Sequence, residues 1–232
     1  MSASVASLPF SFQHLSLAAG VRAAMHRNPG KIACRHRDRT RSYAELMSRI
    51  DRISNALCSG LGLKPGQHGA IIAKNSIEYL EIVIGASQAG VALATVNPRL
   101  SAAEMVGICD DAGAAVVFAD PDAMAMLRDA KLASAPTLIE IGPALEAWLA
   151  QARPSADLPI VNEWDVFTIP YTSGTTGKPK GVLLHHRGLC NLTTLQGRAF
   201  EVSAESRVLQ FASFSFDACT WEVVMAWSSG AS

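Results

Sequence analysis

The 232-residue sequence is poor in charged side chains, and neither sign of charge is in excess. Its 20 Lys and Arg residues balance its 20 Asp and Glu residues. Nucleic acids and anionic membranes select strongly basic surfaces, so this balance argues against either as the main partner. A local positive site for a phosphate remains compatible with zero net charge, because net charge does not report where charges lie.

The sequence also lacks any apolar run long enough to cross a bilayer, so we expect no membrane span. Hydrophobic residues make up 49% of the chain and charged residues 17%. That ratio is too apolar for a disordered chain, and it predicts a folded globular protein.

Acidic residues are missing from the N-terminus until Asp38, and serines are frequent there, a composition that transit peptides share. The first arginine is Arg22, which is late for such a segment, and a secretory signal would need a basic start. We therefore expect a flexible tail over residues 1–14 and a cytoplasmic protein.

No two cysteines have the CxxC spacing, and no group of cysteines and histidines has the spacing of a zinc site. The five cysteines are Cys34, Cys58, Cys109, Cys190 and Cys219. An odd number at wide spacing favours buried, reduced thiols over disulfides or a structural metal.

Helix and strand patterns alternate along the chain. Ser42 with Glu45, and Ser101 with Glu104, have the spacing of a capping box, in which each side chain bonds the backbone N–H of the other residue. The helix that begins after Ser42 should end at Gly60 and Gly62. A further helix is expected at about residues 15–27. Another should begin at Asn75 or Ser76, with Tyr79, Ile82 and Val83 on its inner face. Short apolar runs predict strands over 70–73, 91–96, 114–118, 137–141 and 165–171. This alternation predicts an α/β fold with a largely parallel sheet flanked by helices.

A segment rich in Gly, Ser, Thr and Lys follows the last of these strands. Residues 171–182 read Tyr-Thr-Ser-Gly-Thr-Thr-Gly-Lys-Pro-Lys-Gly-Val. Glycines let backbone N–H groups turn toward an anion, hydroxyls donate to phosphate oxygens, and lysine adds charge. The segment is not a Walker A loop, since Pro179 follows Gly177-Lys178 where that motif has Ser or Thr. The remaining reading from composition alone is a flexible surface loop.

The same string resembles the phosphate-loop signature of the adenylate-forming superfamily, which includes acyl-CoA and aryl-CoA synthetases, luciferases and the adenylation domains of nonribosomal peptide synthetases. Residues 42–46 and 90–100 are similar to earlier motifs of that superfamily, and His186 stands where its members often have a histidine. The resemblance covers residues 15–232. It implies that residues 15–232 form the N-terminal subdomains of the adenylate-forming fold in a truncated form.

The resemblance implies a two-step reaction. A carboxylate attacks the α-phosphate of ATP to give an acyl-adenylate, and the thiol of CoA or of a carrier protein's pantetheine arm then takes the acyl group. Mg²⁺ would bridge phosphate oxygens, and no protein ligand of the metal is assigned. The implied ATP-binding residues are Thr172, Ser173, Gly174, Thr175, Thr176, Gly177, Lys178 and Lys180, of which Lys178 and Lys180 would also act electrostatically in catalysis.

A second stretch, residues 207–222, is similar to the substrate-pocket motif of peptide-synthetase adenylation domains. The resemblance implies that Asp217 binds the α-ammonium of an amino acid and that Ala218 and Trp221 shape a pocket for a hydrophobic or aromatic side chain. A carboxylate suits that role because it pairs with a buried cation. On physics alone Asp217 could instead cap a helix and Trp221 could be core. Glu222 could have a structural role.

The alternative function is that of a CoA ligase for a small or aryl acid, since residues 75–80 and 96–99 resemble acyl-CoA synthetases.

Members of this superfamily are longer, with adenine contacts, acidic catalytic motifs and a mobile C-terminal domain in the additional part. We therefore expect this chain to be an incomplete adenylation domain that does not form a thioester by itself. A catalytically inactive fragment is the third possibility.

Overall fold

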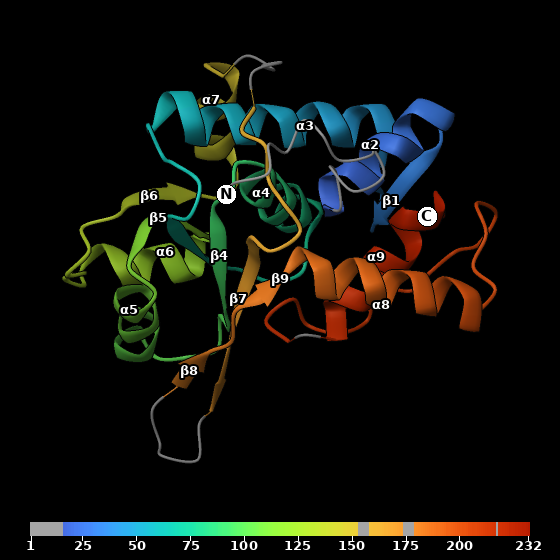
Figure 1. Cartoon of the computed structure of the whole chain (residues 1–232). Coiled ribbons are helices and arrows are strands. Elements are labelled where there is room, and N and C mark those ends of the chain that lie inside the picture. The colour runs from blue at the N-terminus through green and yellow to red at the C-terminus, as the bar shows by residue number, and fades with distance from the viewer. Residues whose placement is uncertain (1–15, 153–157, 174–178, 217) are drawn as a thin grey trace, which may run out of the picture.

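A central sheet organises the protein, and helices cover both of its faces (Figure 1). The computed structural model describes residues 16–152, 158–173, 179–216 and 218–232, so the expected tail over residues 1–14 lies outside it. In the described chain the sheet has the strand order β6-β5-β3-β4-β7-β8, with β9 also paired to β7. Its strands are β3 (His68–Ile72), β4 (Ala92–Val96), β5 (Ala114–Ala119), β6 (Thr137–Glu140), β7 (Val166–Ser173), β8 (Pro179–Gly181) and β9 (Leu184–His185).

The pairs β3–β4, β3–β5, β5–β6 and β4–β7 are parallel, whereas β8 and β9 run antiparallel to β7. The expected α/β fold with a largely parallel sheet is confirmed. The strands at its centre are apolar almost throughout, because a parallel sheet is buried on both faces. Alternate residues divide between two cores, so that Ile71 and Leu93 face one core while Ile72 and Val96 face the other.

The described helices enclose a hydrophobic core on each face of the sheet. The second core lies under α5 (Ala102–Asp111) and α6 (Pro121–Arg128). The first core lies under α3 (Tyr43–Asn55), α4 (Ile77–Gln88) and α7 (Pro143–Ala150).

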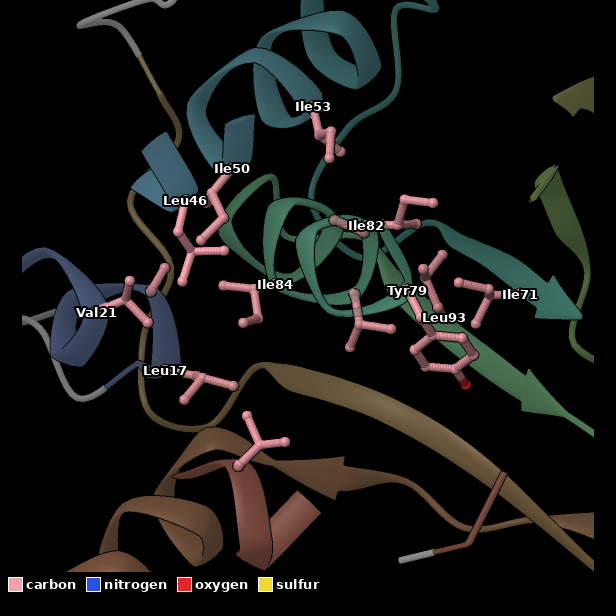
Figure 2. Close-up of a cluster of buried hydrophobic side chains, with 14 of the residues drawn as sticks. Leu17, Val21, Leu46, Ile50, Ile53, Ile71, Tyr79, Ile82, Ile84 and Leu93 are labelled. Carbon is pink, nitrogen blue, oxygen red and sulfur yellow. The ribbon is translucent and has the colours of Figure 1, made fainter. Parts of the chain in front are cut away.

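Helix α4 lies between α3 and the strands, as Figure 2 shows for the side chains that surround it. The expected inner residues Tyr79, Ile82 and Val83 are buried, but so is almost every other residue of α4. A single apolar face was therefore too narrow an expectation, because α3 covers the side of α4 that turns away from the sheet.

Both predicted capping boxes are present, at Ser42 with Glu45 and at Ser101 with Glu104. Ser76, rather than Asn75, caps α4 by accepting a hydrogen bond from Tyr79 N. Helix α3 passes into a π-helical turn, η2 (Ala56–Gly60), and Gly62 then takes a φ of +70°, a conformation that glycine adopts without steric cost. The predicted helix ends at Gly60 and Gly62 are thus confirmed.

The remaining elements pack beside this layered unit. They are α2 (Leu17–Arg27), the hairpin of β1 (Ile32–His36) and β2 (Arg39–Ser42), α8 (His186–Ala199) and α9 (Ala218–Ser229). Trp227 Nε1 donates to Ala33 O at 2.9 Å, and Tyr43 Oη donates to Ala231 O at 2.6 Å. These buried bonds join the C-terminal end of α9 to the N-terminal hairpin, and the residues just after α9 to α3.

Candidate functional site

β7 leaves the parallel sheet and forms a hairpin with β8, which Figure 1 shows projecting from the body of the protein. The strand is longer than the predicted 165–171, because its last residues pair with β8 although they are not apolar. Thr172 lies directly opposite Lys180 in this pair. Opposite residues of an antiparallel pair project from the same face, so the hydroxyl and the ammonium are neighbours on an exposed surface.

The base of this hairpin is anchored to the body. Tyr171 Oη donates a hydrogen bond of 2.7 Å to Asp111 Oδ2 at the end of α5. Burial, together with that bond, raises the pKa of the Tyr171 phenol above its usual value, so the phenol keeps its proton and remains a donor. Gly181 lies so close that an added Cβ would stand 2.8 Å from Ile169 Cγ2 and 3.0 Å from the Tyr171 ring. Glycine at 181 is therefore a packing requirement.

Five of the predicted ATP-binding residues lie outside the described residues, namely Gly174, Thr175, Thr176, Gly177 and Lys178. Ser173 pairs through its backbone with Pro179. The structure therefore brings together Thr172 and Lys180 at the hairpin. The ATP-binding roles of all eight residues remain predictions.

His186 begins α8 and is fully buried against Phe167, with ring centroids 5.6 Å apart. Neither ring nitrogen has a hydrogen-bond partner among the described residues. Burial lowers the pKa of the imidazole to about 4, although the carboxylate of Asp165 opposes this shift, so the ring is neutral at pH 7. Its neighbour His185 is exposed, as expected of a solvated side chain.

The second predicted motif leads into the beginning of α9. Asp217 lies outside the described residues, and Ala218, the first residue of the helix, is half-buried. Trp221 is 44% exposed, so the alternative that it is a core residue is wrong. Glu222 accepts hydrogen bonds from Phe211 N and Ala212 N and is structural in this sense.

Trp221 lines an open groove of about 950 Å³ at the start of α8 and α9. Arg187 also lines this groove, where it forms an ion pair of 2.8 Å with Glu163 and lies 4.8 Å from the ring centroid of Trp164. Thr220 lines both this groove and an apolar cavity that Pro170 of β7 also lines. The beginning of α9 therefore lies beside the strand that carries the hairpin.

Among the residues that the structure describes, no cluster of three or more His, Cys, Asp or Glu side chains could hold a metal ion. The five cysteines are reduced thiols; Cys109 and Cys219 are buried as predicted, and the other three are half-buried. The described helices are all too short or too polar to cross a bilayer.

Comparison with known proteins gives consistent matches. The family described as AMP-binding enzyme matches residues 21–232. The chain is 31% identical over 219 residues to malpinin synthetase of Mortierella alpina, covering 94% of this chain and 3% of that protein. It is 35% identical over 151 residues to the fatty acid–[acyl-carrier-protein] ligase ScoC of Streptomyces coeruleorubidus, covering 64% of this chain and 29% of that protein.

Two solved structures share the fold over 93% of this chain. The N-terminal domain of FACL13 from Mycobacterium tuberculosis superposes with a TM-score of 0.86 at 23% identity, and this chain covers 56% of it. The nonribosomal peptide synthetase FmoA3 superposes with a TM-score of 0.81 at 26% identity, and this chain covers 22% of it. The chain thus spans only a part of the length of the proteins that it matches.

Proposed function

The chain belongs to the AMP-binding family of adenylate-forming enzymes, and on that basis we propose that it supplies the phosphate-binding part of a ligase that activates a carboxylic acid with ATP. The product would be an acyl-adenylate, which then passes its acyl group to CoA or to a carrier-protein pantetheine thiol. The single observation that carries this proposal is the β7–β8 hairpin, which places Thr172 beside Lys180 next to the glycine-rich segment.

In this proposal Thr172 donates a hydrogen bond to a phosphate oxygen, and Lys180 neutralises charge that develops on the departing pyrophosphate. Ser173, Thr175, Thr176 and the backbone at Gly174 and Gly177 add donors, and Lys178 adds a second positive charge. When bound, Mg²⁺ would withdraw negative charge from the phosphate groups. The chain's own contribution is the β7–β8 strand pair, which holds Thr172 and Lys180 side by side before ATP arrives and so lowers the cost of ordering these two residues.

We further propose an amino acid as the substrate, with Asp217 pairing with its α-ammonium and with Ala218 and Trp221 beside its side chain. The exposed indole of Trp221 and the similarity to a nonribosomal peptide synthetase structure support this choice. An acyl- or aryl-acid ligase is the second candidate, which the 35% identity to a fatty acid–[acyl-carrier-protein] ligase favours.

Two measurements test the proposal. Equilibrium dialysis with MgATP should show binding to the chain, and Lys180→Ala should weaken it about tenfold, because one charge-assisted contact is lost. Lys131→Ala, an exposed lysine in the loop before β6, is the matched control and should bind MgATP as the unmodified chain does. Equal affinity in the Lys180 variant and the control would overturn the phosphate-binding role.

The second measurement is acid-dependent ATP–pyrophosphate exchange with a panel of hydrophobic amino acids, aryl acids and fatty acids. Exchange with amino acids that Asp217→Asn abolishes would support the amino-acid substrate. Exchange with amino acids that survives in Asp217→Asn, or exchange with carboxylic acids that lack an amine, would favour the second candidate.

A further inference from the structure

The segment that leads to α9 is held by side chains from two elements that are far apart in the sequence. Asn75, which follows β3 at the carboxyl edge of the sheet, makes three hydrogen bonds with it. Asn75 Nδ2 donates to Gln210 Oε1 at 2.9 Å and to Ala212 O at 2.8 Å, and its Oδ1 accepts from Phe214 N at 3.0 Å. Both amide donors and the amide acceptor of Asn75 are thereby used on one short loop.

Glu222 holds the same loop from the other side. Its carboxylate accepts hydrogen bonds from Phe211 N at 3.0 Å, from Ala212 N at 3.1 Å and from Gln210 Nε2 at 3.1 Å. Hydrogen bonds to an ionised acceptor are stronger than those between neutral groups. Since Glu222 lies in the second turn of α9, these bonds fix the distance between the loop and the helix that follows it.

Tyr79 completes the contact from the sheet side. It is fully buried, one turn after Asn75, and its ring stacks on Phe214 with centroids 4.6 Å apart. Tyr79 Oη also donates to Phe214 O at 3.1 Å. Phe214 is therefore fixed through its ring, its N–H and its carbonyl, and the next residues have little freedom to move relative to β3.

Two of the residues proposed to lie beside the acid, Ala218 and Trp221, follow Phe214 within seven residues, and the side chain of Trp221 is exposed. We call these two residues the acid-binding wall. We propose that Asn75 and Glu222 are positioning residues for this acid-binding wall and thereby determine acid affinity without touching the acid. This inference rests on the function proposed above.

The test compares acid-dependent pyrophosphate exchange in Asn75→Asp and Glu222→Gln with that of the unmodified chain. Asn75→Asp loses both donated bonds but keeps the shape of the side chain and its bond from Phe214 N. Gln210→Ala removes one bond to Asn75 and one bond to Glu222 from the loop side and leaves β3 unchanged, so it carries the test if Asn75→Asp does not fold. Asn28→Asp and Glu205→Gln, which change exposed residues in the same chemical way, are the matched controls.

The expected result is a KM for the acid raised about tenfold in Asn75→Asp and Glu222→Gln, with a smaller rise in Gln210→Ala. The KM for MgATP and the thermal midpoint should stay close to those of the controls. Hydrogen exchange of the peptide 211–216 should become faster in the same variants and not in the controls.

Two outcomes contradict the inference, and they differ. If the unmodified chain exchanges pyrophosphate and the variants keep its KM for the acid, the positioning role is wrong while the proposed function stands. A parallel loss of affinity for both MgATP and the acid, together with a lower thermal midpoint, would reduce Asn75 and Glu222 to ordinary structural residues. If the unmodified chain neither binds MgATP nor exchanges pyrophosphate with any acid, the proposed function fails and this inference fails with it.

Discussion

Tyr171 and Asp111 join the base of the β7–β8 hairpin to the end of α5 through a hydrogen bond of 2.7 Å. The bond crosses 60 residues of sequence and connects the proposed phosphate-binding strands to a helix on the second face of the sheet. The hairpin is therefore supported at the point where it leaves the sheet, although most of its own length is exposed.

Removing this support should weaken phosphate binding. In Asp111→Asn the stronger, charged acceptor is lost, and we expect an affinity for Mg–tripolyphosphate about threefold lower, with little change in stability because the bond is exposed. Asp110→Asn is the control, since its carboxylate accepts from Ser134 instead. Isothermal titration of both variants gives the comparison, and equal affinities would show that the anchor is irrelevant to binding.

Two glycines inside helices should respond oppositely to alanine. A Cβ at Gly85 of α4 would lie 2.6 Å from Ile53 Cγ2 and 3.1 Å from Ile50 O of α3, so the two helices would be forced apart. Figure 2 shows Ile50 and Ile53 on the side of α3 that faces α4. We expect Gly85→Ala to lower the free energy of unfolding by about 2 kcal/mol through overpacking.

Gly107 of α5 has no atom within 4 Å of the position that a Cβ would take. Gly107→Ala should therefore raise the free energy of unfolding by about 0.5–1 kcal/mol, because alanine is the better helix former. Urea denaturation measures both variants, and a stabilised Gly85→Ala would show that the α3–α4 contact is looser than the structure has it.

The Glu81 carboxylate should be essential for stability. It is fully buried and forms ion pairs with Arg49 and Arg41. Arg49 also forms an ion pair of 2.6 Å with Glu146. Burial raises the pKa of Glu81 above its usual value, with the two arginines opposing the shift. Glu81→Ala would leave both guanidinium groups without their buried partner, and we expect a loss of about 3 kcal/mol.

Glu146→Ala is the matched control, because this carboxylate is 53% exposed and its ion pair is screened by water. Its loss should be below about 1 kcal/mol. Thermal and urea unfolding of both variants test the difference. Similar losses of stability at the two positions would contradict the expectation that the buried carboxylate contributes more than the exposed one.

His186 should make the protein less stable in mild acid. Its folded pKa of about 4 lies below the ordinary value of 6.5, so as pH falls the unfolded chain takes up the proton first. The contribution of the neutral ring is complete above pH 6.5 and is lost toward pH 4, which amounts to about 3 kcal/mol. Because the ring nitrogens have no hydrogen-bond partner in the described part of the chain, His186→Leu should be tolerated and should flatten the pH dependence over this range.

The control for this experiment is His185→Leu, since His185 is exposed. Urea unfolding at intervals between pH 4 and 7 gives the slopes. An unchanged slope in His186→Leu would mean that another group causes the acid sensitivity.

The parts of the fold that sequence predicts are those with local causes. The capping boxes at Ser42 and Ser101 are predicted because serine and glutamate three residues apart satisfy the same helix end. The central strands are predicted because a strand buried on both faces is apolar along its whole length. Each of these signals is complete within a few neighbouring residues.

The features that the sequence did not predict depend on contacts between residues far apart in the chain. The last residues of β7 are polar, so their pairing with β8 depends on Gly181 and Tyr171 fitting together and has no periodic signal. The outer side of α4 is buried because α3 happens to cover it. Asn75 was expected only as a possible helix start, and its three bonds to a loop more than 130 residues later have no sequence signature.

β7 exchanges partners along its length, since Thr168–Pro170 pair with β4 in parallel and Tyr171–Ser173 pair with β8 in the opposite direction. Side chains alternate with a period of two along a strand, so one residue inserted before Thr172 would carry its hydroxyl to the other side. The same limit applies when the hairpin of a longer relative is grafted onto β7. If the graft changes the length of the strand by an even number of residues, its hydrogen-bond donors project from the same surface as Thr172. If the change is an odd number of residues, the donors project from the opposite surface, even when the loop itself is copied without change.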